Sequence, residues 1–133
     1  MNTDVNSPRI AFAYPYPGGN NLPRVNFFGE NGKVSVGIGV AFMNLAARHD
    51  YRCSFSIESP GKVLLLSKDD SIYTLNPSNI DQANGTTFVR LDVTMSTTEI
   101  GYYHVKCKLH DHDGQEIDNR NIWFHLDVMV DIK

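Results

Sequence analysis

The sequence predicts an all-β fold, a two-sheet antiparallel sandwich of seven to eight strands with at most one short helix. Apolar side chains recur at every second position in several separate segments, the pattern of strands with one buried face. Glycine, proline, asparagine and aspartate lie between these segments, where they favour turns. The chain has 133 residues, 41% of them hydrophobic and 20% charged. This length and composition suit one core, so we expect residues 1–133 to form one domain.

The clearest predicted strand is Val34–Phe42, in which every second side chain is apolar. Asn31-Gly32 precedes it, and this dipeptide readily adopts the two positive φ angles of a type I′ turn. We therefore expect Val25–Gly29 and Lys33–Phe42 to pair as an antiparallel hairpin.

Further strand signals follow along the chain. Tyr51–Ile57 alternates in the same way and is closed by a Pro-Gly pair. The next two segments are short, which is typical of strands at a sheet edge. Asn76–Ala83 is the only segment with a helix start, because asparagine can cap a helix and proline suits its first position. The remaining strands are predicted at Lys62–Ser67, Ser71–Leu75, Thr87–Met95, Tyr102–His110 and Asn121–Val130.

Residues 1–23 differ in composition, because aromatic residues alternate with prolines before a glycine- and asparagine-rich stretch. One interpretation is an edge strand near Arg9–Ala13 followed by a surface loop, since proline is disfavoured in central strands. The other is an extended arm that docks on a partner, because proline-rich chains lose little entropy when they become ordered.

Charge and composition exclude several functional classes. The chain has 12 Lys and Arg against 15 Asp and Glu, a formal net charge of −3. This argues against non-specific binding to nucleic-acid phosphates. We find neither a bilayer-length apolar stretch nor a secretory signal, so we expect no membrane contact and a cytoplasmic location. We also expect no cofactor, because no glycine-rich loop precedes a helix and no nucleophile is paired with a base.

One local motif resembles a known family. Glu99-Ile100-Gly101-Tyr102-Tyr103 is similar to the tyrosine corner of immunoglobulin-like sandwiches. The resemblance implies that the Tyr103 hydroxyl bonds to the backbone between the fifth and sixth strands. On that scaffold Cys53 would lie on the third strand and Cys107 on the sixth, adjacent in one sheet. Both would then be inert, buried thiols.

The second face of the Val34–Phe42 strand carries only small residues: Ser35, Gly37, Gly39 and Ala41. Glycine weakens a strand, so two at alternate positions indicate that something approaches the backbone closely. An aromatic side chain from the Tyr14–Tyr16 segment could cover them. Alternatively, a second copy of the chain could pack there and form a symmetric dimer.

A different outward face should carry Tyr102, His104, Trp123 and His125 on two neighbouring strands, together with Lys106 and Lys108. Lysines on such a face can simply be solvated. An exposed tryptophan beside a tyrosine is more informative, because both residues are enriched at binding surfaces. We therefore predict these four aromatic and histidine residues as a binding surface, with Trp123 as the main contact.

The segment His110–Asp118 permits a metal hypothesis. His110 and His112 could bind zinc or nickel, with His104 or His125 as further ligands. A calcium loop of the EF-hand kind does not fit, because its twelfth position would be Ile122. The simpler interpretation is that aspartate and glycine form the turn between two long strands.

Taken together, these patterns favour a non-enzymatic interaction or assembly domain that acts through its sheet faces. Its partner would be another protein or a second copy of the chain, as in a homodimer. A small-ligand or carbohydrate-binding sandwich that uses Trp123 and Tyr102 is the alternative. A metal-dependent site at the His110–Asp118 hairpin is a third hypothesis.

Overall fold

The computed structural model describes residues 7–17, 22–46, 49–66, 72–75, 80–81 and 84–130. Residues 128–130 are described by their backbone only. It confirms the all-β prediction, and the described residues contain no helix. Nor do they contain an apolar helix long enough to cross a membrane. The strands are β1 (Arg9–Tyr16), β2 (Asn26–Glu30), β3 (Lys33–Met43), β4 (Tyr51–Glu58), β5 (Leu64–Leu66), β6 (Ile72–Leu75), β7 (Thr87–Ser96), β8 (Gly101–His110) and β9 (Glu116–Val130).

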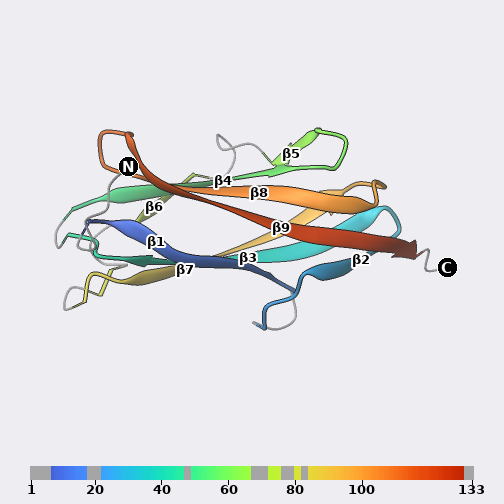
Figure 1. The fold of residues 1–133 in the computed structure, drawn as a ribbon, viewed down its shortest axis with the longest axis horizontal. Helices are drawn as coiled ribbons and strands as arrows, with labels where there is room; N and C mark the ends of the chain where they lie inside the picture. Colours follow the sequence, from blue (N-terminus) through green and yellow to red (C-terminus); the bar gives the residue numbers. More distant parts are fainter. Residues whose placement is uncertain are drawn as a thin grey trace.

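The strands form two layers (Figure 1), and β2 is hydrogen-bonded to one strand of each layer. One layer contains β4, β8 and β9, with the short β5 and β6 paired to β4. The other contains β1, β3 and β7, and β3 lies between its two partners. The apolar faces of both layers point inward, so the core lies between them.

The expectation of a purely antiparallel fold is wrong at one place, because β2 pairs with β9 in parallel. The predicted turn does form: Asn31 and Gly32 have φ angles of 54° and 76°. However, β2 and β3 share only the pair Glu30 and Lys33. Beyond it β2 diverges to pair with β9 and joins the two layers into one mixed, nine-stranded sheet.

The strand boundaries follow the predicted alternation, with two extensions. β1 continues three residues beyond the expected Ala13 and includes Pro15, which is tolerated because β1 pairs along only one edge with β3. β9 begins at Glu116, five residues before the expected start. Most of the predicted helical turn lies outside the described residues; within it, Asp81 forms an isolated bridge with Thr86.

The core is built from alternating side chains of the long strands. Strand β3 contributes five buried apolar side chains from Val34 to Phe42, and β8 contributes four from Tyr103 to Leu109. The predicted adjacency of the cysteine strands is confirmed, since Phe55 of β4 lies opposite Cys107 of β8. Both cysteines are buried and free.

The tyrosine corner forms as the resemblance implies. The Tyr103 hydroxyl donates a 2.6 Å hydrogen bond to the Glu99 carbonyl. It also lies 2.8 Å from Thr97 Oγ1, and because the tyrosine has one proton, Thr97 is the donor of this second bond. The ring stacks on Phe124, with centroids 5.0 Å apart. Tyr103 therefore fixes the turn that leads into β8.

Removal of the Tyr103 hydroxyl should lower the free energy of unfolding by about 1–2 kcal/mol, because the Glu99 carbonyl and Thr97 would lose their partner. Urea unfolding of Tyr103→Phe followed by circular dichroism measures this loss. Tyr102→Phe is the matched control, since Tyr102 is 64% exposed and should change stability by less than about 0.5 kcal/mol. Equal stabilities of the two variants would show that the corner contributes nothing.

Candidate functional site

The four predicted contact residues come together on the outer face of β8 and β9. Tyr102 lies opposite His125, and His104 lies opposite Trp123. Tyr102 is 64% exposed and Trp123 is 53% exposed. We call this set of two cross-strand pairs the outer ladder.

The side chains of the outer ladder hold one another in place. The His104 ring stacks on Trp123 with centroids 5.2 Å apart and an interplanar angle of 28°. Tyr102 and His125 meet edge to face at 4.8 Å. His104 Nε2 lies 2.7 Å from Asn121 Oδ1, which can accept a hydrogen bond from it. These contacts restrict the rotamers before any partner binds, so less entropy is lost on association.

The surroundings of the outer ladder are less cationic than the sequence suggested. Lys108 forms a 3.0 Å ion pair with Glu116. The hydrogen bond from Lys108 is the main reason why the pKa of Glu116 lies below its usual value. Glu58 of β4 lies opposite His104 and approaches Lys62 at 3.6 Å. The outer ladder is thus an aromatic surface with neighbouring charges of both signs.

The two glycines of β3 are covered from within the chain. A Cβ added to Gly37 would overlap the Tyr16 ring. Tyr16 is buried, and its hydroxyl donates a 3.1 Å hydrogen bond to Asp92. Burial, reinforced by this carboxylate, raises the pKa of Tyr16 to about 12. The ring is therefore anchored over the glycine.

Gly39 is covered in the same way from both neighbouring strands. A Cβ at this position would lie 2.9 Å from Phe88 Cζ and 3.0 Å from Tyr14 Cζ. Ser35 remains exposed and Ala41 is half-buried. For the two glycines, the structure shows the internal aromatic cover. A second copy could reach Gly37 and Gly39 only by displacing these rings.

Adding a methyl group at Gly37 should destabilise the fold by about 1–3 kcal/mol, because the Tyr16 ring must move. Thermal or urea unfolding of Gly37→Ala measures this change. Ser35→Ala is the control on the same face; it removes only an exposed 3.0 Å hydrogen bond with Thr94 and should change stability by less than about 0.5 kcal/mol. In a Tyr16→Ala background the effect of Gly37→Ala should shrink; an unchanged effect would contradict the proposed overlap.

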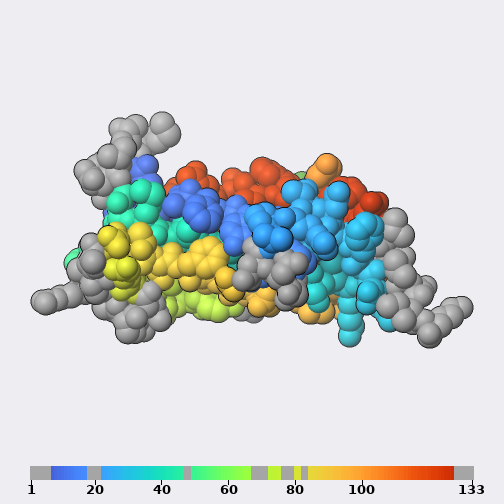
Figure 2. Space-filling model, turned by 90° about the horizontal axis from the view of Figure 1, so that it is seen from below, coloured from blue at the N-terminus to red at the C-terminus, as the bar shows by residue number. Residues whose placement is uncertain are grey.

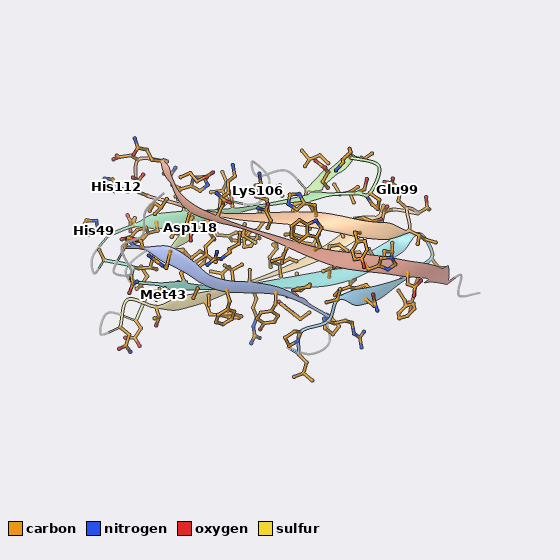
Figure 3. All side chains as sticks on the ribbon, in the orientation of Figure 1. Met43, His49, Glu99, Lys106, His112 and Asp118 are labelled. Carbon is orange, nitrogen blue, oxygen red and sulfur yellow. The ribbon has the colours of Figure 1, made fainter. Side chains whose placement is uncertain are left out.

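The structure separates the residues of the metal hypothesis. His110 Nε2 lies 3.0 Å from Ser54 Oγ, whereas His112 lies on the turn, 3.4 Å from Asp113. The His112 ring faces His49 at 6.4 Å, at the same end of the molecule (Figure 3). Within the described ranges, no group of three or more His, Cys, Asp or Glu residues could hold a metal ion. The described residues therefore hold no group of three such ligands that would include His110 and His112.

The turn interpretation of this segment agrees with the geometry. Asp111 Oδ1 accepts 2.9 Å hydrogen bonds from the amides of Asp113 and Gln115. Gly114 has a φ of 84°, a conformation that glycine adopts readily. Asp111 and Gly114 thus serve the β8–β9 connection.

The cysteines are poor candidates for nucleophiles. Burial raises the pKa of each thiol to about 12, so the reactive thiolate is scarce at neutral pH.

Neither thiol of the native protein should react with Ellman's reagent at pH 8 within minutes, whereas both should react in urea. Rapid reaction of the native protein would contradict this burial.

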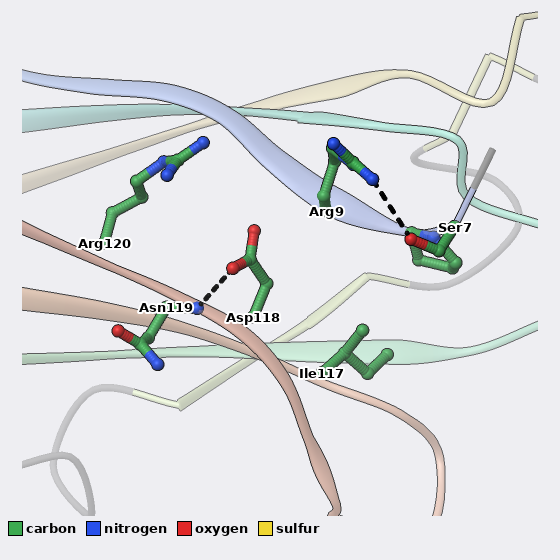
Figure 4. Close-up of a pocket in the computed structure, with 7 residues that line it drawn as sticks. Ser7, Arg9, Ile117, Asp118, Asn119 and Arg120 are labelled. Carbon is green, nitrogen blue, oxygen red and sulfur yellow. Dashed lines mark hydrogen bonds between the residues drawn. The ribbon is translucent and has the colours of Figure 1, made fainter. Parts of the chain in front are cut away.

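Sequence reasoning missed a cleft between β1 and β9 (Figure 4). It has a volume of about 350 Å³ and is lined by Arg9, Arg120 and Asp118, among others. Asp118 accepts a 2.8 Å hydrogen bond from the Ile10 amide, and Arg120 donates a 3.0 Å bond to the Ile10 carbonyl. Ile10 lies more than 100 positions before Asp118 and Arg120 in the sequence, so no local signal marks these contacts. Their observed contacts hold β1 against β9.

No protein-family model matches the chain, and no curated protein matches it in sequence. Several solved structures share its fold. A putative β-galactosidase from Bacteroides fragilis matches with a TM-score of 0.61 and 14% identity over 87% of this chain and 17% of that one. A calcium-binding mutant of β-glucuronidase 2 from Bacteroides uniformis matches with a TM-score of 0.65 and 12% identity, over 90% and 14%.

A third solved structure matches over nearly its whole length. It is the CARDB domain of a Pyrococcus furiosus protein in complex with di-metal ions, with a TM-score of 0.50 and 12% identity, over 96% of this chain and 99% of that one. By contrast, the chain spans less than a fifth of each of the two glycosidases. At these identities the likeness shows a shared β-sandwich fold.

Proposed function

We propose that this chain is a non-catalytic interaction domain whose outer ladder binds another protein chain. The single observation that carries the proposal is that Trp123 and Tyr102 are both exposed and belong to consecutive cross-strand pairs on the same face of β8 and β9. Tryptophan and tyrosine are enriched among the residues that dominate the energy of protein interfaces. The partner is either a different protein or a second copy of the chain.

Further exposed apolar residues lie at the ends of the neighbouring strands. Ile100 is 57% exposed and lies two positions before Tyr102. Val25 is 56% exposed and lies just before β2, where its carbonyl accepts a 2.7 Å hydrogen bond from the His125 amide. Exposed apolar residues near an aromatic surface favour association with another protein.

A protein partner explains the ring geometry better than a sugar does. His104 stacks against Trp123 and occupies one face of the indole. A sugar could therefore stack only on the other face of the indole, whereas a protein groove can also enclose the ring edges and the exposed Tyr102. Carbohydrate binding at Trp123 is the alternative function.

Replacement of Trp123 by alanine should leave the fold intact and weaken partner binding by about tenfold or more, because Trp123 is an exposed tryptophan of the ladder. Sedimentation velocity at increasing concentration tests a second copy, and quantitative capture from a lysate followed by titration with the purified partner tests another protein. Phe12→Ala, on the opposite layer and like Trp123 53% exposed, is the matched control.

Loss of binding in Trp123→Ala with retention in Phe12→Ala would support the outer ladder. The proposal would be contradicted if the protein does not self-associate and if no purified partner binds with an affinity that depends on Trp123. A large fall in the thermal midpoint of Trp123→Ala would instead assign this residue to the fold.

A further inference from the structure

A second exposed aromatic surface lies on the outer face of the β1, β3 and β7 layer. Phe12 of β1 is 53% exposed, Phe88 of β7 is 41% exposed, and Tyr14 lies half-buried between them. We call these three residues the aromatic patch. Figure 2 shows this side of the molecule, where the side chains of β1 (blue) and β7 (yellow) lie next to each other.

The rings of the aromatic patch are aligned. Tyr14 and Phe12 have centroids 6.1 Å apart and planes inclined by 23°. Tyr14 and Phe88 have centroids 6.2 Å apart and planes inclined by 28°. The tips of Tyr14 and Phe88 both reach over Gly39, so these two side chains extend along the sheet instead of projecting straight into solvent. The patch is thus a preformed apolar surface.

Charged groups border the aromatic patch without giving it a net charge. The Arg90 guanidinium carbon lies 5.5 Å from the centre of the Phe88 ring. Asp92 is two residues further along β7 and accepts the hydrogen bond of Tyr16. Both residues are exposed. A ligand on the rings would therefore meet the hydrogen-bond donors of Arg90 and the acceptors of Asp92, and the opposite charges of these two side chains cancel.

We propose that the aromatic patch binds a neutral oligosaccharide. A pyranose ring presents an apolar C–H face that can pack on aromatic rings, while its hydroxyl groups can accept from Arg90 and donate to Asp92. The balanced charges favour a neutral ligand over an anionic one. This site goes beyond the outer ladder, since it lies on the other layer and uses different residues.

A sugar suits the Arg90 side chain that lies against the Phe88 ring. Sugar hydroxyls would keep the guanidinium donors hydrogen-bonded when the rings are covered, whereas a purely apolar partner surface would leave these donors without acceptors.

The test uses cellohexaose, xylohexaose and mannohexaose as neutral probes, with isothermal titration calorimetry and amide NMR shifts as readouts. At least one probe should bind with a dissociation constant of about 10 μM to 1 mM. The shifted amides should lie on β1 and β7. Phe12→Ala and Phe88→Ala should each weaken binding by about tenfold or more, because each removes one stacking ring.

Two matched variants control the assignment. Phe28→Ala removes a phenylalanine of β2 that is 57% exposed, and Trp123→Ala removes the main residue of the outer ladder. Neither should change the affinity for the sugar. Phe12 is half exposed, so Phe12→Ala should keep the wild-type thermal midpoint and provides a readout even where Phe88→Ala is destabilised.

Four results would overturn the proposal. The first is that no neutral probe binds at about 5 mM. The second is that Phe28→Ala weakens sugar binding as much as Phe12→Ala does, and the third is that only Trp123→Ala weakens it. The fourth is that hexagalacturonate binds more tightly than any neutral probe. A dimer that dissociates on Phe12→Ala would likewise show that a second copy covers this face. The third result would leave the outer ladder as a binding surface, whereas the others bear only on the aromatic patch.

Discussion

The packing of aromatic rings over the two glycines of β3 is the constraint on which the rest of the structure depends. Strand β3 pairs with β1 on one side and β7 on the other, while its inner face fills the core. Because Gly37 and Gly39 have no side chains, Tyr16, Tyr14 and Phe88 can lie over the backbone. This cover fixes the position of β1. Strand β1 in turn reaches β9 through the hydrogen bonds of Asp118 and Arg120 to Ile10, so the same packing helps to hold the two layers together.

Several polar residues that could have carried chemistry instead serve the chain geometry. The Asp111 carboxylate accepts hydrogen bonds from backbone amides of its own turn. The Tyr103 hydroxyl secures the corner before β8. His110 pairs with Ser54, and the buried thiols of β4 and β8 have strongly raised pKa values. These polar groups are thus satisfied within the fold.

The sequence could predict what local periodicity determines. Alternation identified β3, β4, β7 and β8, and the motif around Tyr103 identified the corner, because both are encoded within a few residues. The parallel pairing of β2 with β9 could not be predicted, since alternation defines which face is buried and leaves the pairing partner open. The outer ladder was predictable because both of its strands belong to one hairpin. The aromatic patch was only half visible: Tyr14 was a candidate cover for the glycines, but the approach of Phe88 over Gly39 depends on tertiary packing.

The two layers therefore present aromatic surfaces of different kinds, the outer ladder with rings stacked in pairs and the aromatic patch with rings that reach across glycine. The most direct measurement of the underlying packing is a proton NOESY spectrum of the wild-type protein. Cross-peaks should join the Gly37 α protons to the Tyr16 ring and the Gly39 α protons to the rings of Tyr14 and Phe88, with α-proton shifts displaced by ring currents. Absence of these cross-peaks, together with ordinary strand shifts for both glycines, would show that the rings turn away from β3 and would contradict the packing on which the fold and the aromatic patch depend.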